Sequence, residues 1–452
     1  MYTYQDFVKD SANDLYSAIS TVINNHITSS VYKTAIDSDR YDAQQNTTIM
    51  EFTKKLYHVN DAPDVNATTN RLCSNFFRRL NTQRVTYSMG NGMQFTEKST
   101  KKKLGIDFDT KMQSAGYFGC IHGVTFIFWN YDHIHNFKVT EFAPLWDEET
   151  GRLVAGVRFW QIDKDKPSTA VLYELDGYTV FEGTAGFSDF HIKEEKRAYK
   201  QTIAKAPADD CPEVISEENY NGFPIIPLYG SRLHQSTLVG MKAQIDAYDL
   251  VRSGFADDLA ECSEIYWIVG NAGGMLDSDL TKFRNRLKLE HIASIPDVDD
   301  ITVTPYTQEI PYQSRKAFLD DIRAGIYEDF GALDVHTISA GATNDHIEAG
   351  YQPMDENADD FELQIIEAVQ SLLKLIGIND TPIFKRNRIS NEKETTEMIL
   401  TSANYLDDET VLQLLPFVTP DMVESIMEKK EDEVMKRYEG KPPEEDTEED
   451  EE

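Results

Sequence analysis

Apolar residues recur with a helical period through the second half of the chain. Between residues 236 and 268, where no proline occurs, they are spaced three or four positions apart: Leu238, Met241, Ile245, Tyr248, Val251, Phe255, Leu259, Cys262 and Ile265. This spacing predicts one amphipathic helix of roughly 30 residues, or roughly 45 Å, with a single apolar stripe. A helix of that length must lie against neighbours along its length. The same period predicts helices at 313–332 and 357–377, the latter ending at Gly377.

The first 230 residues have a mixed pattern. Helical stripes are predicted at 4–28 and 67–81, with an irregular polar segment at 36–48 between them. Residues 84–95 have the pattern of two short strands around a glycine turn, and 117–230 consist mostly of strand-sized runs rich in β-branched and aromatic residues. Within those runs, Asp176-Gly177 predicts a hairpin turn. The predicted fold class is therefore α+β, with a substantial antiparallel sheet.

A compact insert separates the two long helices. Residues 269–312 contain a glycine turn, a short helix to about Leu289 and two strand-like runs. After the second helix, a polar glycine-rich loop is predicted at 336–353. Two further helical stretches follow at 391–417 and 420–438. The last twelve residues, "KPPEEDTEEDEE", are predicted to be disordered because their acidic side chains repel one another.

The glycine turn in "IYWIVGNAGGMLDSDL" raises the question of nucleotide binding. A P-loop needs a lysine and a hydroxyl residue after its last glycine, but Met275 and Leu276 follow Gly274. A dinucleotide fingerprint needs the spacing GxGxxG, whereas the spacing here is GxxGG, and the preceding residues continue a helical pattern. We therefore interpret the glycines of this turn as a hinge leaving the long helix: Gly270, Gly273 and Gly274.

Net charge narrows the classes of partner. The chain of 452 residues is long enough for two to four domains. It includes 44 basic and 78 acidic side chains, which give a formal charge of −34. Such a chain repels nucleic acid and anionic membranes at long range unless its basic residues are gathered locally. Two basic clusters stand out, one at Lys98 and Lys101 to Lys103, the other in the insert: Lys282, Arg284, Arg286 and Lys288.

Several classes of protein are disfavoured by what the sequence lacks. No apolar run approaches the ~20 residues of a membrane span. The N-terminus has no signal-peptide pattern, and the four cysteines are widely spaced, which predicts a protein made in a reducing cytoplasm. No GxSxG or similar nucleophile motif is present, and we predict neither a cofactor nor enzymatic activity.

One enzymatic alternative rests on the stretch "YDHIHNF". Two histidines separated by one residue on a strand face the same way and can ligate a metal, so Asp132, His133 and His135 would be the centre of a metal-dependent hydrolase or nuclease. No second spaced pair of ligands accompanies them. The simpler interpretation places these side chains on a polar face of the sheet.

The order of the segments resembles that of the portal proteins of tailed bacteriophages, specifically the SPP1-type group. The most specific part is "FPIIPLYG" followed by "GMKAQIDAYDLVRSGFADDLAE", a proline-marked strand and then the long helix. Four other stretches are similar: "DRYDAQQNTTI", "NRLCSNFFRRLNTQRVTYSMGNGMQF", "GYFGCIHGVTFIFWN", and "FKRNRISNEKETTE" with "LPFVTPDMVE". The similarity extends over nearly the whole chain.

This resemblance implies a portal-protein fold with wing, paired long stem helices, a small αβ clip insert, a tunnel loop and a helical crown. The implied ranges are 1–232 for the wing, 233–268 and 313–335 for the stem helices, 269–312 for the clip, 336–353 for the tunnel loop, 354–385 for a wing-crossing helix, 386–440 for the crown and 441–452 for a disordered acidic tail.

The resemblance also implies a function. Such proteins form a ring of about twelve subunits at the unique capsid vertex, and double-stranded DNA passes through the ring during packaging and ejection without sequence-specific contacts. Implied partners are the terminase large subunit, then the head-tail adaptor, together with the major capsid and scaffold proteins, and the implied location is the virion after synthesis in the host cytoplasm. The tunnel loop would line the channel with Ser339, Gly341, Thr343, Asn344 and His346.

The basic cluster of the clip, Lys282, Arg284, Arg286 and Lys288, would contact either DNA or an acidic partner, and the sequence leaves both open. A second alternative to the portal assignment is another virion protein, such as a capsid or adaptor subunit. That class would share the acidity but has no need of two long helices around an insert.

Overall fold

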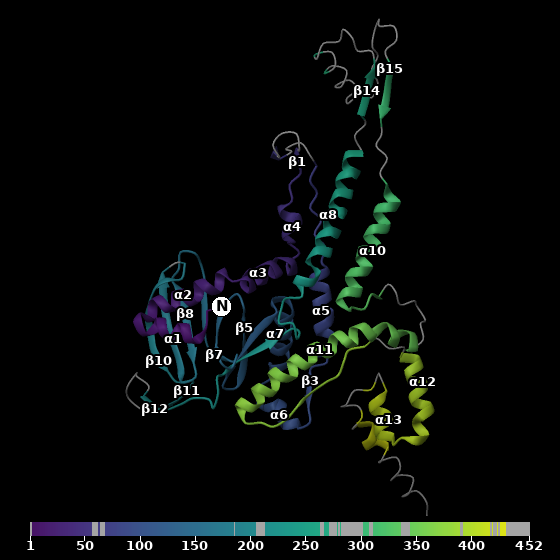
Figure 1. Ribbon diagram of the computed structural model, residues 1–452. Helices are drawn as coiled ribbons and strands as arrows, with labels where there is room; N and C mark the ends of the chain where they lie inside the picture. Colours follow the sequence, from purple (N-terminus) through teal and green to yellow (C-terminus); the bar gives the residue numbers. More distant parts are fainter. Residues whose placement is uncertain are drawn as a thin grey trace, which may run out of the picture. The chain divides into compact units, whose positions relative to one another are not determined.

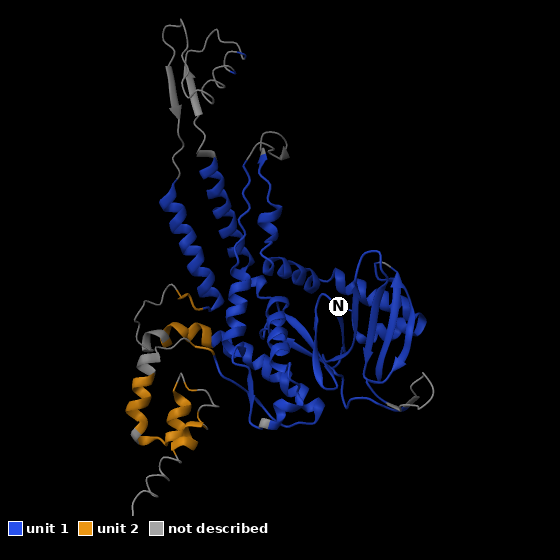
Figure 2. Cartoon of the chain, turned by 180° about the vertical axis from the view of Figure 1, so that it is seen from behind, with its two compact units in different colours: residues 1–332, 356–386 blue, residues 333–355, 387–452 orange. Residues whose placement is uncertain are grey.

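Two compact units make up the chain in the computed structural model, residues 1–332 with 356–386 and residues 333–355 with 387–452 (Figure 2). The structure describes residues 2–56, 62–63, 68–184, 186–204, 213–262, 266–270, 278, 281, 302–306, 311–335, 344–388, 392–415, 418, 423 and 425–430. Within these residues, no helix is both long enough and apolar enough to cross a membrane.

The first unit begins with helices α1 (Tyr4–Asn13), α2 (Leu15–Thr28) and α3 (Ser30–Asp42). The helical stripe predicted at 4–28 is therefore two helices. The break has a local cause, because the Asp14 side chain accepts hydrogen bonds from the N–H groups of Tyr16 and Ser17 and so caps α2. Along α2, Ile19 and Ile23 are fully buried.

A five-stranded antiparallel sheet packs against α1 and α2 (Figure 1). Its strand order is β10-β9-β8-β7-β6. The strands are β6 (Phe142–Trp146), β7 (Leu153–Gln161), β8 (Ser168–Glu174), β9 (Gly177–Thr184) and β10 (Ser188–Arg197). The predicted hairpin is confirmed, because Glu174 pairs with Gly177 across the turn, and Gly177 has a φ of 141°.

A second antiparallel sheet has the order β13-β4-β5. It is formed by β4 (Val124–Asn130), β5 (His133–Lys138) and β13 (Ile225–Tyr229) and packs on helix α7 (Phe108–His122). Short elements complete this unit: α4 (Thr47–Glu51), β1 (Lys55–Leu56), β2 (Ala62–Pro63), α6 (Lys98–Lys103), β11 (Lys200–Ala204) and β12 (Glu213–Glu218). The α+β class is confirmed.

Three local predictions in this unit are wrong. Residues 36–48 are mostly helical, in α3 and α4, and residues 117–122 belong to α7. Helix α5 (Phe76–Met89) includes residues 84–89, for which a strand was predicted. The helix is favoured there by tertiary burial, since Arg84, Val85 and Met89 all lie inside the unit, and this burial overrides the β propensity of Val85 and its neighbours.

The turn after α5 agrees with the prediction. It leads into β3 (Met93–Phe95), whose partner is β16 (Pro382–Phe384) from the far end of the chain. Helix α11 (Asn344–Ile376) precedes β16 in the chain. Its residues Phe361, Ile365, Val369 and Leu372 are fully buried in a core shared with α5, α7 and β4. As predicted, this helix ends at Gly377, which has a φ of 80°.

The loop predicted at 336–353 is only partly a loop. Residues 344–353 form the first turns of α11, with Pro353 inside the helix, and residues 336–343 lie outside the described part of the chain. Further on, α12 (Glu392–Ser402) and a 3₁₀ turn, η2 (Ala403–Tyr405), precede α13 (Asp408–Leu414). The helix predicted at 391–417 is therefore interrupted, because the Asp407 side chain caps a new helix. The acidic tail lies outside the described residues.

Candidate functional site

Two long antiparallel helices extend from the core of the first unit (Figure 1). They are α8 (Leu238–Cys262, 25 residues) and α10 (Tyr312–Phe330, 19 residues). Contacts join them at both ends: Gln244 Nε2 donates to Asp329 Oδ2 over 2.5 Å, and Arg315 forms an ion pair with Asp258. At the core end, α8 and α10 share one buried cluster: Leu238, Met241, Ile245, Ile326 and Tyr327.

Helix α8 ends earlier than predicted, whereas α10 agrees with the prediction at 313–332. The apolar period continues to Ile265, but α8 ends at Cys262 and residues 266–270 form strand β14 (Tyr266–Gly270). This strand pairs antiparallel with β15 (Thr302–Tyr306), from Tyr266 opposite Tyr306 to Gly270 opposite Thr302. The aromatic and β-branched side chains at 266–269 favour an extended chain. Helix α10 ends where Gly331 adopts the left-handed conformation.

The presence of strand β14 before the glycine turn does not support a nucleotide-binding site there. A dinucleotide site needs parallel βαβ connectivity, whereas β14 pairs antiparallel with β15. Of the three predicted hinge glycines, Gly270 is the last residue of β14, and Gly273 and Gly274 lie outside the described residues.

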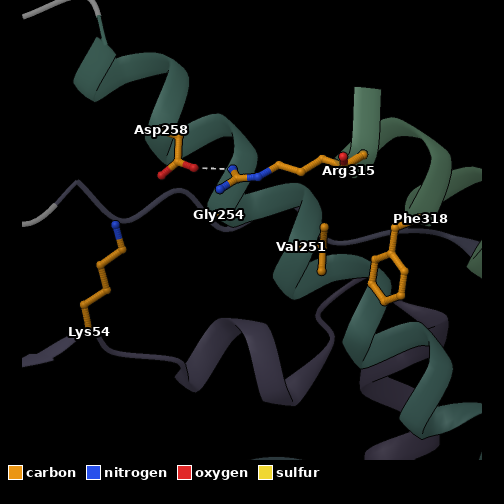
Figure 3. Close-up of a pocket in the computed structure, with 7 residues that line it drawn as sticks. Lys54, Val251, Gly254, Asp258, Arg315 and Phe318 are labelled. Atoms are coloured by element: carbon orange, nitrogen blue, oxygen red, sulfur yellow. Dashed lines mark ion pairs between the residues drawn. The ribbon is translucent and has the colours of Figure 1, made fainter. Parts of the chain in front are cut away.

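A groove of about 460 Å³ runs between α8, α10 and the chain near Lys54 (Figure 3). Its lining consists of Lys54, Val251, Gly254, Asp258, Ser314, Arg315 and Phe318. Apolar side chains are exposed at this end of the helices: Phe318 is 49% exposed, and Leu259 and Tyr312 are each 54% exposed. Because the groove lining combines apolar surface with one acid–base pair, it suits a packing partner better than a reaction.

Hydrogen bonds from the segment 70–74 hold the other face of α8, and we call this set of contacts the polar ladder. Three side chains spaced four residues apart accept hydrogen bonds from alternate backbone N–H groups of the segment 70–74: Asp249 from Ser74 (2.9 Å), Ser253 from Leu72 (3.0 Å) and Asp257 from Asn70 (2.6 Å). Four helical residues advance about 6.0 Å and two extended residues about 6.6 Å, so the two repeats stay in register.

Further polar contacts extend this ladder at both ends. Asn46 donates to Asp249, Lys54 lies 3.2 Å from Asp257, and Lys242 donates to Asp246 over 2.8 Å. Burial raises the pKa of the Asp249 carboxyl, and the hydrogen bonds from Asn46 and Ser74 oppose that shift. The sequence did not reveal this site. The four-residue spacing of Asp249, Ser253 and Asp257 is a signal for a polar helix face, but nothing in it identifies the segment that binds there.

The predicted site residues fall mostly outside the described chain. This applies to Lys282, Arg284, Arg286 and Lys288 of the insert, and to Ser339, Gly341 and Thr343 of the loop. Asn344 and His346 are the exception, since their backbone begins α11. They were predicted to lie in a loop, and the helix corrects that.

The structure brings Asp132, His133 and His135 together at the start of β5. His133 Nδ1 lies 2.5 Å from Asp132 Oδ1, and the Nε2 atoms of the two histidines are 2.9 Å apart. Burial, followed by the nearby His133, Lys111 and Arg158, lowers the pKa of His135. Among the described residues, no group of three or more His, Cys, Asp or Glu side chains is placed to hold a metal ion.

Comparison with known proteins gives the family of the chain. A family model described as "Phage portal protein, SPP1 Gp6-like" matches residues 20–436. The chain belongs to this family of phage portal proteins.

A curated relative agrees with that assignment. This portal-family chain is 25% identical over 214 residues to the portal protein of Clostridium phage phiCD119, a match covering 45% of this chain and 48% of that one. The match thus spans about half the length of the relative. Among solved structures, the neck of an empty GTA particle computed with C6 symmetry aligns with 77% of this chain and 91% of that chain, at 10% identity and a TM-score of 0.43. That likeness is too distant to support an argument about function.

Proposed function

We propose that this portal-family chain forms the ring-shaped channel at the unique capsid vertex, through which DNA is packaged and later ejected. The observation that carries the proposal is the helix pair α8 and α10, anchored in a core at one end and followed at the other by the antiparallel pair of β14 and β15, within a family match over 20–436. In this assignment, α8 and α10 are the stem helices, and the insert between them is the clip.

In the same proposal, residues 1–232 are the wing, 336–353 are the tunnel loop, 354–385 cross back to the wing, and 386–440 are the crown. The last part of the proposed tunnel loop, 344–353, is the start of α11. The clip cluster from Lys282 to Lys288 contacts DNA or an acidic partner. The clip binds the terminase large subunit first and the head-tail adaptor later, while capsid and scaffold proteins surround the wing in the virion.

Charge supports passage of DNA rather than its retention. Each chain carries a formal charge of −34, so a ring of about twelve chains is strongly acidic. Every phosphate held by a cation releases counterions and strengthens binding, so a lumen rich in Lys and Arg would hold the DNA in place. An acidic ring with few cationic positions lets the duplex slide without reading its sequence. The proposed role is structural and needs no catalytic residue.

The exposed end of the stem also supports assembly. Phe318, Leu259 and Tyr312 present apolar surface beside the groove of α8 and α10, and in a ring a neighbouring copy covers this surface. The hydrophobic effect then contributes to association in proportion to the apolar area buried.

Native mass spectrometry of the purified full chain, combined with negative-stain images, tests the proposal. We expect a ring of about twelve subunits with a central hole, in free solution or after addition of capsid and scaffold proteins. A chain that stays monomeric under all of these conditions contradicts the proposal. Metal-dependent hydrolysis of DNA by the purified protein, abolished by His135→Gln, would support the enzymatic alternative instead.

A further inference from the structure

The turn between β4 and β5 holds two histidines in a fixed arrangement. Asn130 pairs with His133, so only Tyr131 and Asp132 form the turn, and the Tyr131 N–H donates to the Tyr220 hydroxyl over 2.9 Å. Side chains two residues apart on a strand point to the same face, which places His133 and His135 side by side. Their ring centroids are 4.6 Å apart.

The carboxylate of Asp132 selects the free nitrogen of His133. Because Asp132 Oδ1 is 2.5 Å from His133 Nδ1, that nitrogen carries the proton and Nε2 carries the lone pair. A carboxylate on the second nitrogen of a histidine is the usual support of a metal-ligating imidazole. In the metal-free protein, the lone pair of His133 Nε2 accepts the hydrogen bond from His135 Nε2 over 2.9 Å.

That spacing matches two ligands of one metal ion. Imidazole nitrogens bind divalent transition metals at about 2.0–2.1 Å, so two of them at a right angle on the same ion are about 2.9 Å apart. Because the two Nε2 atoms face each other in their hydrogen bond, both rings must turn for the lone pairs to converge on one ion, and a tetrahedral angle at that ion requires a separation of about 3.3 Å. When a metal binds, the His135 proton moves from Nε2 to Nδ1 of the same ring, so the charge of the ring does not change.

From this geometry we propose that His133 and His135 form a two-nitrogen site for a divalent transition metal, with Asp132 as the outer carboxylate. Copper, followed by nickel and zinc, fits imidazole ligands and an open site, whereas magnesium and calcium require oxygen ligands. The His133 side chain is 45% exposed, so water fills the remaining coordination positions. Lys111 and Arg158 lie near His135 and oppose the added positive charge, whereas Asp132 offsets it.

Copper titration of the full chain tests this site, by calorimetry and by electron paramagnetic resonance of the bound Cu²⁺. We expect a site with two nitrogen ligands, binding at least tenfold weaker in His133→Gln and in His135→Gln, and weaker to a smaller extent in Asp132→Asn. His191→Gln, which removes an exposed histidine of β10, is the matched control and should leave that site unchanged.

Unfolding temperatures separate a folding defect from a loss of metal binding. These exposed substitutions should leave the metal-free unfolding temperature within a few degrees of the native value, while copper raises that temperature in the native chain and in His191→Gln more than in His135→Gln. Equal copper binding by the native chain and by a His133→Gln, His135→Gln double variant would overturn the proposal. So would the same loss in the His191→Gln control.

Discussion

Ser74 and Asp249 are joined by a hydrogen bond of 2.9 Å from the backbone N–H of Ser74 to a carboxylate oxygen that is fully buried on α8. The bond is one of three that repeat at successive turns of α8, and it places the segment 70–74 along the proposed stem. A helix proposed to pack in a ring is thus held to its own subunit by polar contacts on one face, while its apolar surface near the groove remains free for a neighbour.

The middle bond of this ladder gives the cleanest stability test. Ser253→Ala removes the acceptor for the Leu72 N–H without changing charge, and a buried donor without a partner costs about 1–3 kcal/mol. We expect that loss in the free energy of unfolding from denaturant titration. Ser17→Ala, on an exposed part of α2, is the control and should change stability by less than about 0.5 kcal/mol. Similar values for both variants would show that the ladder contributes little.

Two glycines should respond in opposite directions to alanine. Gly123 has a φ of 90°, and a Cβ there would lie 2.7 Å from the backbone carbon of Gln235, so Gly123→Ala should lose at least about 2 kcal/mol. Gly240 lies in α8 with open space around it, and Gly240→Ala should gain about 0.5–1 kcal/mol. Thermal unfolding of both variants measures the difference. A stable Gly123→Ala chain would mean that the junction between α7 and β4 can move.

Acid should weaken the contact of α2 with the turn that follows β5. His26 Nε2 donates to the Val139 carbonyl over 2.7 Å, and burial lowers the pKa of His26 below its usual 6.5. Below pH 6.5 the unfolded chain therefore binds a proton that the folded chain excludes, so stability falls as pH falls, by no more than about 1.4 kcal/mol per pH unit.

The comparison that isolates this effect is native protein against His26→Gln, unfolded at about pH 7.5 and about pH 5.5. The native chain should exceed His26→Gln in free energy of unfolding by less at about pH 5.5 than at about pH 7.5. Ser17→Ala, at an exposed position of α2 without a titratable side chain, is the control and should show no such pH-dependent difference. If the difference in free energy of unfolding between the native chain and His26→Gln stays constant across this pH range, the assignment of a neutral, buried His26 is contradicted.

Filling the groove should block assembly without unfolding the chain. A Cβ at Gly254 meets no atom of the chain within 4 Å, so Gly254→Leu should fold normally. If a neighbouring copy covers this groove, the added side chain should shift the population from rings toward single chains in native mass spectra. Gly240→Leu, also in open space on α8, is the matched control. Rings that form equally well in both variants would exclude the groove as a contact between copies.

The sequence pattern correctly predicted the elements that depend only on residues close together in the chain. The hairpin at Asp176-Gly177, the helix end at Gly377 and the two long helices follow from turn chemistry and spacing. The prediction was wrong where contacts between residues far apart in the sequence determine the secondary structure. Residues 84–89 contain strand formers but are helical because they are buried against other elements, and residues 266–268, at the end of the predicted long helix, lie in β14.

The candidate site was predictable only in outline. The sequence indicated the helix pair and the insert, because the apolar stripe carries that information. It did not indicate that Asp249, Ser253 and Asp257 bind the backbone at 70–74, because a hydrogen bond to a main-chain N–H leaves no signature in the residues that donate it. For His133 and His135 the sequence predicted one face of a strand, and the structure added the distances of these histidines from each other and from Asp132.

Because β3 pairs with β16, this part of the fold can form only late in the synthesis of the chain. Phe95 lies opposite Pro382, so β3 acquires its partner only after the about 290 residues between them have been synthesised. At about 5–20 residues per second, that interval is roughly 15 to 60 seconds. During it the core also lacks Phe361 and Ile365 of α11, so its apolar surface at Met93 and Met112 stays open to solvent or to a chaperone. A nascent chain truncated before residue 382 should therefore bind chaperones and aggregate, whereas the completed chain closes its own core.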